Sequence, residues 1–69
     1  MNTQISTSEK LRRLSAAGVT HSQVARVSGV PQPTIWRIAS GKHAQPLERT
    51  VIAIDRAYHE LMKPDAEVA

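Results

Sequence analysis

The segment from Gln32 to Arg37 carries side chains suited to molecular recognition. An amide (Gln32), a hydroxyl (Thr34), an indole (Trp36) and a guanidinium (Arg37) lie within six residues, with Pro33 among them. Amide and guanidinium groups form paired hydrogen bonds with the edges of nucleic-acid bases, and hydroxyl groups bond bases or phosphates. The chemistry that this segment offers is therefore hydrogen bonding and ring packing, without covalent bond formation.

The residues that most often perform catalysis or hold metals are sparse and poorly spaced. The chain has no cysteine, and its three histidines are His21, His43 and His59. Asp55 and His59 are four residues apart, a spacing more typical of a helix-surface pair than of a zinc site. There is no phosphate-binding glycine loop and no nucleophile elbow. We therefore expect no enzyme activity, no catalytic residue, no metal, no cofactor and no small-molecule substrate.

A first short helix is predicted over residues 21–28. Thr20 supplies a side-chain oxygen for the free amides at a helix start, and Gln23 stands where it can bond back in a capping box. Val24 lies on the inward side of this helix. Gly29 follows at the place where a helix commonly ends in a left-handed residue.

A tight turn and a second helix over residues 32–40 follow directly. Val30 is an apolar residue for the space between the two helices, and Pro31 disfavours continuation of the first helix. Ile35 and Ile38 give the inward spacing of three residues. The remaining side chains of this helix then lie away from the core: Gln32, Pro33, Thr34, Trp36, Arg37 and Ser40.

Two further helices are predicted around this pair. The first covers residues 7–17, begins at a capping pair formed by Ser6 and Glu9, and has an inward stripe of Leu11, Leu14, Ala17 and then Val19. The last covers residues 46–63, with Pro46 at its first position and an inward stripe of Leu47, Val51, Ile54, Tyr58 and Leu61. The last stripe has two interpretations, a domain core or a coiled-coil seam between subunits. The core is favoured because sustained coiled coils use three or four heptads.

The length and composition predict the fold class. A chain of 69 residues has room for one domain, and the apolar residues are mostly Leu, Ile, Val and Ala. We predict an all-α bundle of four helices spanning 1–69, with flexible ends over 1–5 and 64–69. No apolar stretch reaches the roughly 18 residues of a membrane span, and the start lacks the apolar region of a signal peptide. We expect a cytoplasmic protein with no membrane partner.

The charge is unevenly distributed along the chain. Residues 10–47 carry six lysines and arginines and no acidic residue, whereas the remainder has six acidic residues against three cations. A segment of charge +6 beside one of −3 indicates a polyanionic partner, although a chance fluctuation on a solvated surface is the alternative. Arg12 and Arg13 are equally compatible with solvation and with phosphate contact.

The pattern resembles the helix-turn-helix of the lambda-repressor-like family, which includes phage Cro and repressor proteins. The resemblance covers roughly residues 8–61 and rests on Thr20, Val24, Ala25, Gly29, Val30, Thr34, Ile35, Arg37, Ile38, Ser40, Gly41 and Lys42. The chain departs from the family's usual residues at His21, Pro31 and Trp36. In such proteins the second helix of the motif enters the major groove of DNA and the first crosses the backbone.

The resemblance implies a function and a set of contacts. The function is that of a sequence-specific, double-stranded DNA-binding transcriptional regulator that acts as a homodimer on a pseudo-palindromic operator. The expected base contacts are Gln32, Pro33, Thr34, Trp36 and Arg37, and the expected backbone contacts are His21, Ser22, Ser40, Lys42 and His43. Four of these have alternative roles: Gln32 as a solvated turn residue, Thr34 in capping its helix, Trp36 in covering the core, and Arg37 in an ion pair with the last helix.

Two other functions stay open at this level. The short segment between Leu14 and Thr20 also resembles the corresponding part of resolvase or transposase helix-turn-helix modules. A helical protein-interaction module is the third alternative, and unlike the others it would bind no duplex DNA at low salt.

Overall fold

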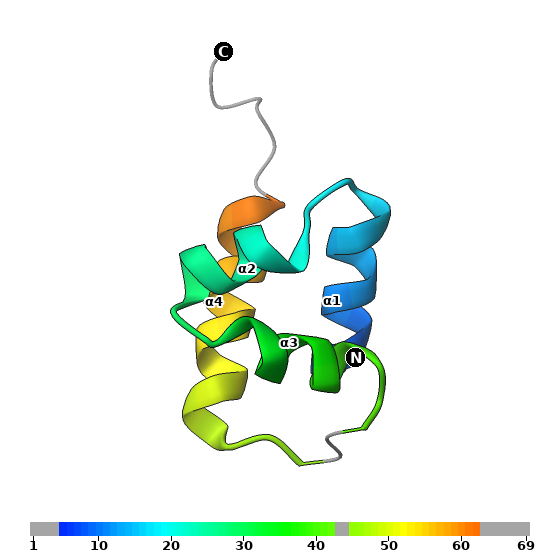
Figure 1. Ribbon diagram of the computed structural model, residues 1–69. Helices are drawn as coiled ribbons and strands as arrows, with labels where there is room; N and C mark the ends of the chain where they lie inside the picture. The colour runs from blue at the N-terminus through cyan, green and yellow to red at the C-terminus, as the bar shows by residue number, and fades with distance from the viewer. Residues whose placement is uncertain (1–4, 43–44, 63–69) are drawn as a thin grey trace.

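The computed structural model describes residues 5–42 and 45–62, which form four α-helices (Figure 1). The helices are α1 (Thr7–Ala16), α2 (His21–Ser28), α3 (Gln32–Ala39) and α4 (Glu48–Leu61), and the described residues contain no strand. The prediction of an all-α bundle with a helix-turn-helix in its middle is therefore confirmed.

Side-chain caps set the starts of two helices, α1 and α2. The Ser6 hydroxyl accepts a hydrogen bond from the Glu9 amide at 3.1 Å, so α1 begins directly after Ser6. Thr20 and Gln23 form the complete capping box at the start of α2, with both reciprocal bonds present. These contacts satisfy amides that have no partner inside the helix. The sequence therefore specifies these starts through residues only three positions apart.

The core lies where all four helices meet. Leu11, Leu14, Val24, Ile35 and Ile54 are fully buried, and Val30 and Ile38 complete the cluster. Each helix contributes at least one of these side chains, and Val30 contributes from the turn between α2 and α3. The helices alone would not be stable in water at these lengths, so burial of this shared cluster maintains them.

The four helices form two pairs that cross. Figure 1 shows α1 and α4 running in roughly the same direction, with α2 and α3 lying across them. The helices α1 and α2 each pack against both α3 and α4. The outward side of α3 is therefore left uncovered, while its inward side is held by α1 and α2.

The structure corrects several predicted helix ends. The last helix begins at Glu48 and not at Pro46, because Leu47 has an extended backbone (ψ 150°) and occupies the cap position. The helix predicted to end at Ser40 ends at Ala39, and the first ends at Ala16. The predicted end of the last helix at residue 63 lies outside the described residues.

Two predicted core positions are wrong. Leu47 is 61% exposed, because it precedes the first turn of α4 and so does not share the periodicity of that helix. Ala17 is exposed as the cap residue after α1. Ala57, which was not expected inside, is 2% exposed and faces the bundle.

Candidate nucleic-acid interface

The outward face of α3 carries the side chains singled out from the sequence. Gln32, Pro33, Trp36 and Arg37 are all exposed. Burial of Ile35 and Ile38 fixes the rotation of the helix, because residues three apart lie on the same side. An amide, an indole and a guanidinium are thereby presented to solvent together on a rigid element.

Thr34 differs from these neighbours because it is half-buried. It lines a hollow of about 430 Å³ shared with the start of α4, where Leu47 and Thr50 also lie. Its side chain does not cap α3, since the cap residue is Pro31 and no side-chain bond is present at this end. The capping alternative for Thr34 is therefore wrong, and the hydroxyl lies at the margin between α3 and α4.

The turn between α2 and α3 is built from three consecutive residues. Gly29 adopts the left-handed conformation with φ 80°, and its N–H donates to the Ala25 carbonyl at 2.8 Å. The Val30 N–H donates to the Ser28 hydroxyl at 3.1 Å while its side chain enters the core. The angle between the two helices is thus fixed by a backbone conformation and by an apolar anchor.

Trp36 lies on the surface and does not cover the core. Its side chain is 51% exposed and is absent from the residues that pack against the buried cluster. The Lys42 ammonium lies over its ring, 5.5 Å from the centroid, at a distance where cation and π face attract. The aromatic ring and the positive charge therefore form one exposed unit at the end of α3.

Arg37 has no ion pair among the described residues, so the predicted alternative of a bridge to α4 is wrong within that part of the chain. Its backbone carbonyl accepts two hydrogen bonds, from the Ser40 hydroxyl at 3.2 Å and from the Lys42 N–H at 2.9 Å. These bonds hold Ser40 and Lys42 close to the end of α3. The Arg37 guanidinium itself is exposed and available.

The amino end of α2 lies beside α3 and α1. His21 is half-buried and Ser22 is exposed. Arg12, His21, Trp36 and Ser40 line one hollow of about 240 Å³. Three of the predicted contact residues are therefore brought together here, whereas His43 lies outside the described residues.

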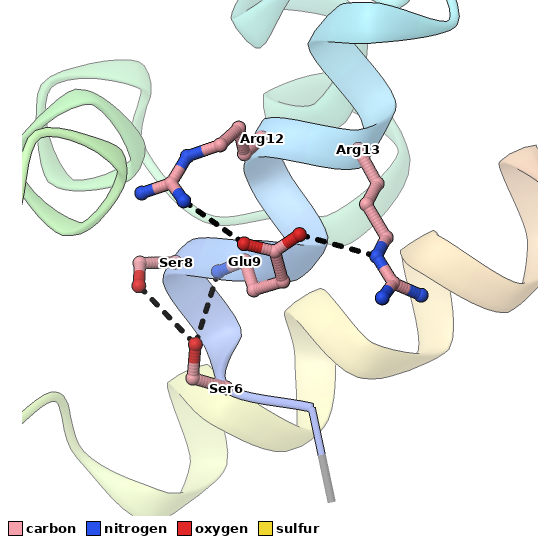
Figure 2. A network of polar contacts seen from close by, with 5 residues as sticks. All are labelled: Ser6, Ser8, Glu9, Arg12 and Arg13. Atoms are coloured by element: carbon pink, nitrogen blue, oxygen red, sulfur yellow. Dashed lines mark hydrogen bonds and ion pairs between the residues drawn. The ribbon is translucent and has the colours of Figure 1, made fainter.

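The sequence left Arg12 open between solvation and phosphate contact, and the fold brings it beside His21, Trp36 and Ser40. Figure 2 shows Arg12 and Arg13 directed to opposite sides of Glu9, whose carboxylate they contact at 2.9 and 3.3 Å. Arg12 faces the hollow beside α3. Figure 2 shows the Arg13 side chain directed toward α4, and Tyr58 of α4 together with Glu9 raises the pKa of Arg13. Leu11 and Leu14 mark the buried side of α1 in the sequence. They would have assigned Arg12 and Arg13 to different sides if the packing of α1 on α3 had been known.

Glu9 takes a different role from the one predicted. Its amide makes the capping bond to Ser6, but its carboxylate bonds the two arginines and does not return to the Ser6 amide (Figure 2). The expected reciprocal capping pair is therefore only half formed. Part of the positive charge of α1 is balanced by this carboxylate, while the segment from α2 to Lys42 contains no acidic residue.

A second charged cluster joins α1 to α4, away from α3. The Lys10 ammonium pairs with Asp55, and the His59 imidazole lies 3.6 Å from the same carboxylate. The hydrogen bond from Lys10 lowers the pKa of Asp55 below its ordinary value. Within residues 5–42 and 45–62, no three His, Cys, Asp or Glu side chains gather as a metal site requires. The described helices include none long and apolar enough to cross a membrane.

Comparisons with known proteins agree with this architecture. A family described as helix-turn-helix domain matches residues 8–67. Protein P2 of Acyrthosiphon pisum secondary endosymbiont phage 1 is 38% identical over 53 residues, which are 77% of this chain and 56% of that protein. The chain thus corresponds to little more than half the length of this relative. No solved structure matches significantly. The motif geometry and a match over most of the chain lead to the same conclusion: the chain belongs to the helix-turn-helix domain family.

Proposed function

We propose that this protein is a sequence-specific, double-stranded DNA-binding transcriptional regulator of the phage Cro or repressor type. The observation that carries the proposal is the exposed face of α3, where Gln32, Trp36 and Arg37 project from a helix held by a helix-turn-helix. No acidic residue occurs between α2 and Lys42 to repel phosphates. Similarity to a phage protein is consistent with the phage assignment.

In the proposed complex α3 enters the major groove. Gln32 bonds an adenine and Arg37 bonds a guanine, each with two hydrogen bonds. Pro33 and Trp36 contact thymine methyl and sugar groups, and Thr34 bonds at the margin of the groove. The exposed Trp36 ring with the Lys42 ammonium over it is suited to the groove, because a base pair for the ring and a backbone phosphate for the ammonium lie close together there.

The backbone contacts are proposed to come from the two ends of the motif. His21 and Ser22 approach one phosphate at the start of α2, where the helix dipole also favours negative charge. Ser40, Lys42 and His43 approach a second beyond the end of α3. Such contacts position the protein without reading the sequence.

Two copies are proposed to bind a pseudo-palindromic operator, with half-sites about one helical turn, roughly 34 Å, apart. One copy presents a single recognition helix, which covers only a half-site. Pairing two copies therefore supplies the specificity that one lacks. The proposed place of action is the cytoplasm of a bacterium or phage-infected cell, on the nucleoid.

The test is selection of bound sites from random duplexes, followed by titration of the selected duplex at several salt concentrations. The logarithm of the affinity should fall linearly with the logarithm of salt concentration. Arg37→Ala should cost about 1–3 kcal/mol on the selected site and relax the preference at one base position. Lys42→Ala should weaken binding to all sequences alike and reduce the salt slope by about one.

Arg13→Ala is the matched control, because this arginine lies on the α4 side of α1. It should leave the base preference unchanged. Absent or salt-independent duplex binding by the unaltered protein would overturn the proposal. A preference for protein partners with no duplex binding at low salt would instead favour an interaction module.

A further inference from the structure

The outer face of α4 has no partner among the described residues, and its composition differs from the rest of the surface. Its exposed residues are Glu48, Arg49, Ile52, Arg56, His59 and Glu60. We propose that a second copy of this chain docks on this face, with the two α4 helices antiparallel about a twofold axis. The inference deepens the proposed function, since an operator with two half-sites needs two copies.

Charge favours a second copy at this face. The segment from Lys10 to Leu47 carries six cations and no acidic residue, so two copies that met through it would repel each other. The outer face of α4 instead carries both signs: Arg49 and Arg56 against Glu48 and Glu60. A surface with balanced charge can meet its own copy without net repulsion.

The order of these charges along α4 selects the antiparallel arrangement. Arg49 lies in the first turn of the helix and Glu60 lies in the last turn. Rotation by 180° therefore places Arg49 opposite the partner's Glu60, and by symmetry Glu60 opposite the partner's Arg49. A parallel arrangement would bring like charges together at both ends.

The same register brings a small residue to the centre of the contact. Positions 49, 53, 56 and 60 recur at spacings of four, three and four, which is a stripe along which two helices can pack. Within this stripe Ala53 is half-buried and also packs against the core of its own domain. With Arg49 opposite the partner's Glu60, Ala53 lies opposite the partner's Arg56. The short side chain of Ala53 lets the helices approach and leaves room for the aliphatic part of the arginine.

Exposed apolar side chains border this stripe. Ile52 is 48% exposed on α4, and Val27 is 46% exposed at the end of α2. Val27, Ala53, Arg56 and Glu60 line one hollow of about 290 Å³ between α2 and α4. The hollow offers a place for a side chain of the partner, and its walls would bury apolar area on association.

The proposed contact leaves the exposed side chains of α3 free. The inward side of α3 is packed on α1 and α2, and no residue of α3 lines the α2–α4 hollow. Arg49 and Ala53 also line the hollow that holds Thr34, so the contact borders α3 at this one half-buried residue. Two copies joined through α4 can therefore present two α3 helices at once. This is the requirement for a protein that binds two half-sites.

The experiment is charge reversal with rescue, measured by sedimentation equilibrium from micromolar to millimolar protein. Arg49→Glu and Glu60→Arg should each weaken self-association at least about tenfold, because each creates two like-charge contacts per dimer. The double variant carrying both changes restores opposite charges across the axis and should recover self-association. Arg26→Glu, a charge reversal on the exposed side of α2, is the matched control and should leave self-association unchanged.

Circular dichroism melts verify that each variant is folded. A protein that stays monomeric at millimolar concentration, or single reversals without effect, would overturn the inference. Loss in both single variants without recovery in the double variant would refute the antiparallel register and therefore the proposal.

Binding to a duplex that holds only one half-site separates this inference from the proposed function. The α4 variants should bind the half-site as the unaltered protein does, while their cooperative binding to the full site falls. If the unaltered protein binds neither duplex, the proposed function fails. If it binds both without self-association, only the inference about α4 fails.

Discussion

Gly29 offers a direct test of how the helix-turn-helix angle is fixed. Its φ of 80° lies in the left-handed region, yet a Cβ built at this position would meet nothing within 4 Å. Substitution by alanine should therefore cost backbone strain alone, without a steric clash. The left-handed conformation costs roughly 1–2 kcal/mol for a residue with a Cβ.

Part of this cost is offset in the unfolded chain. Replacing Gly29 by alanine restricts the unfolded backbone, which favours the folded state by about 0.4–1 kcal/mol. The net loss for Gly29→Ala should then be about 0–1.6 kcal/mol. In a domain of this size each kcal/mol corresponds to a fall of about 4–8 °C in Tm. Gly29→Asn should lose less, because asparagine enters the left-handed region more readily than alanine.

The assay is urea unfolding followed by circular dichroism at 222 nm, with Gly18→Ala as the matched control. Gly18 also has a positive φ, of 90°, and open space around its Cβ position, but it lies between α1 and α2, outside the turn. The two alanine variants should lose similar stability. A loss above about 3 kcal/mol at Gly29 only would indicate a clash and refute the reasoning. Equal stability of the alanine and asparagine variants at Gly29 would refute it too.

Other predictions concern the capping box, the core and the charged cluster. Thr20→Ala should cost about 1 kcal/mol in unfolding free energy, because it removes the acceptor for the Gln23 amide. Ile35→Ala, at a fully buried position, should cost about 2–5 kcal/mol and leave a protein that is largely unfolded in thermal melts. Lys10 lowers the pKa of Asp55 in the folded protein below the value of about 3.9 for an unfolded carboxyl group. The ionised Asp55 therefore stabilises the fold above about pH 3.9, and this stabilisation is lost as the pH falls through the lower folded pKa. Asp55→Asn should therefore be less stable than the unaltered protein at pH 7, by at most about 1 kcal/mol because the pair is partly exposed. In urea titrations the two stabilities should converge as the pH falls below the folded pKa of Asp55.

The elements that the sequence predicted well depend on contacts between near neighbours. Ser6 and Thr20 begin helices by accepting amides three residues ahead, and Gly29 ends one by its own backbone freedom. Ile35 and Ile38 set the rotation of α3 through a spacing of three residues. The exposure of Gln32, Trp36 and Arg37 followed from these local rules, so the candidate site on α3 was largely predictable.

Errors appeared where a residue lies beyond the end of a regular element. In the sequence, Leu47 continues the apolar spacing of α4, but in the structure it precedes the helix and is exposed. Ala17 is similarly the cap residue after α1. Periodicity predicts burial only while the backbone keeps a constant rotation per residue, and that rotation stops at the cap.

By itself the sequence determined the four helices, the position of the turn and the positive charge of the central segment. The tertiary structure alone decided which long-range neighbours these residues have. It placed Arg12 beside His21 and Trp36, turned Arg13 toward α4, and left Trp36 on the surface with Lys42 above its ring. The physical reason is that capping and periodicity act within a few residues, whereas the surroundings of a side chain depend on how separate helices pack around a shared core.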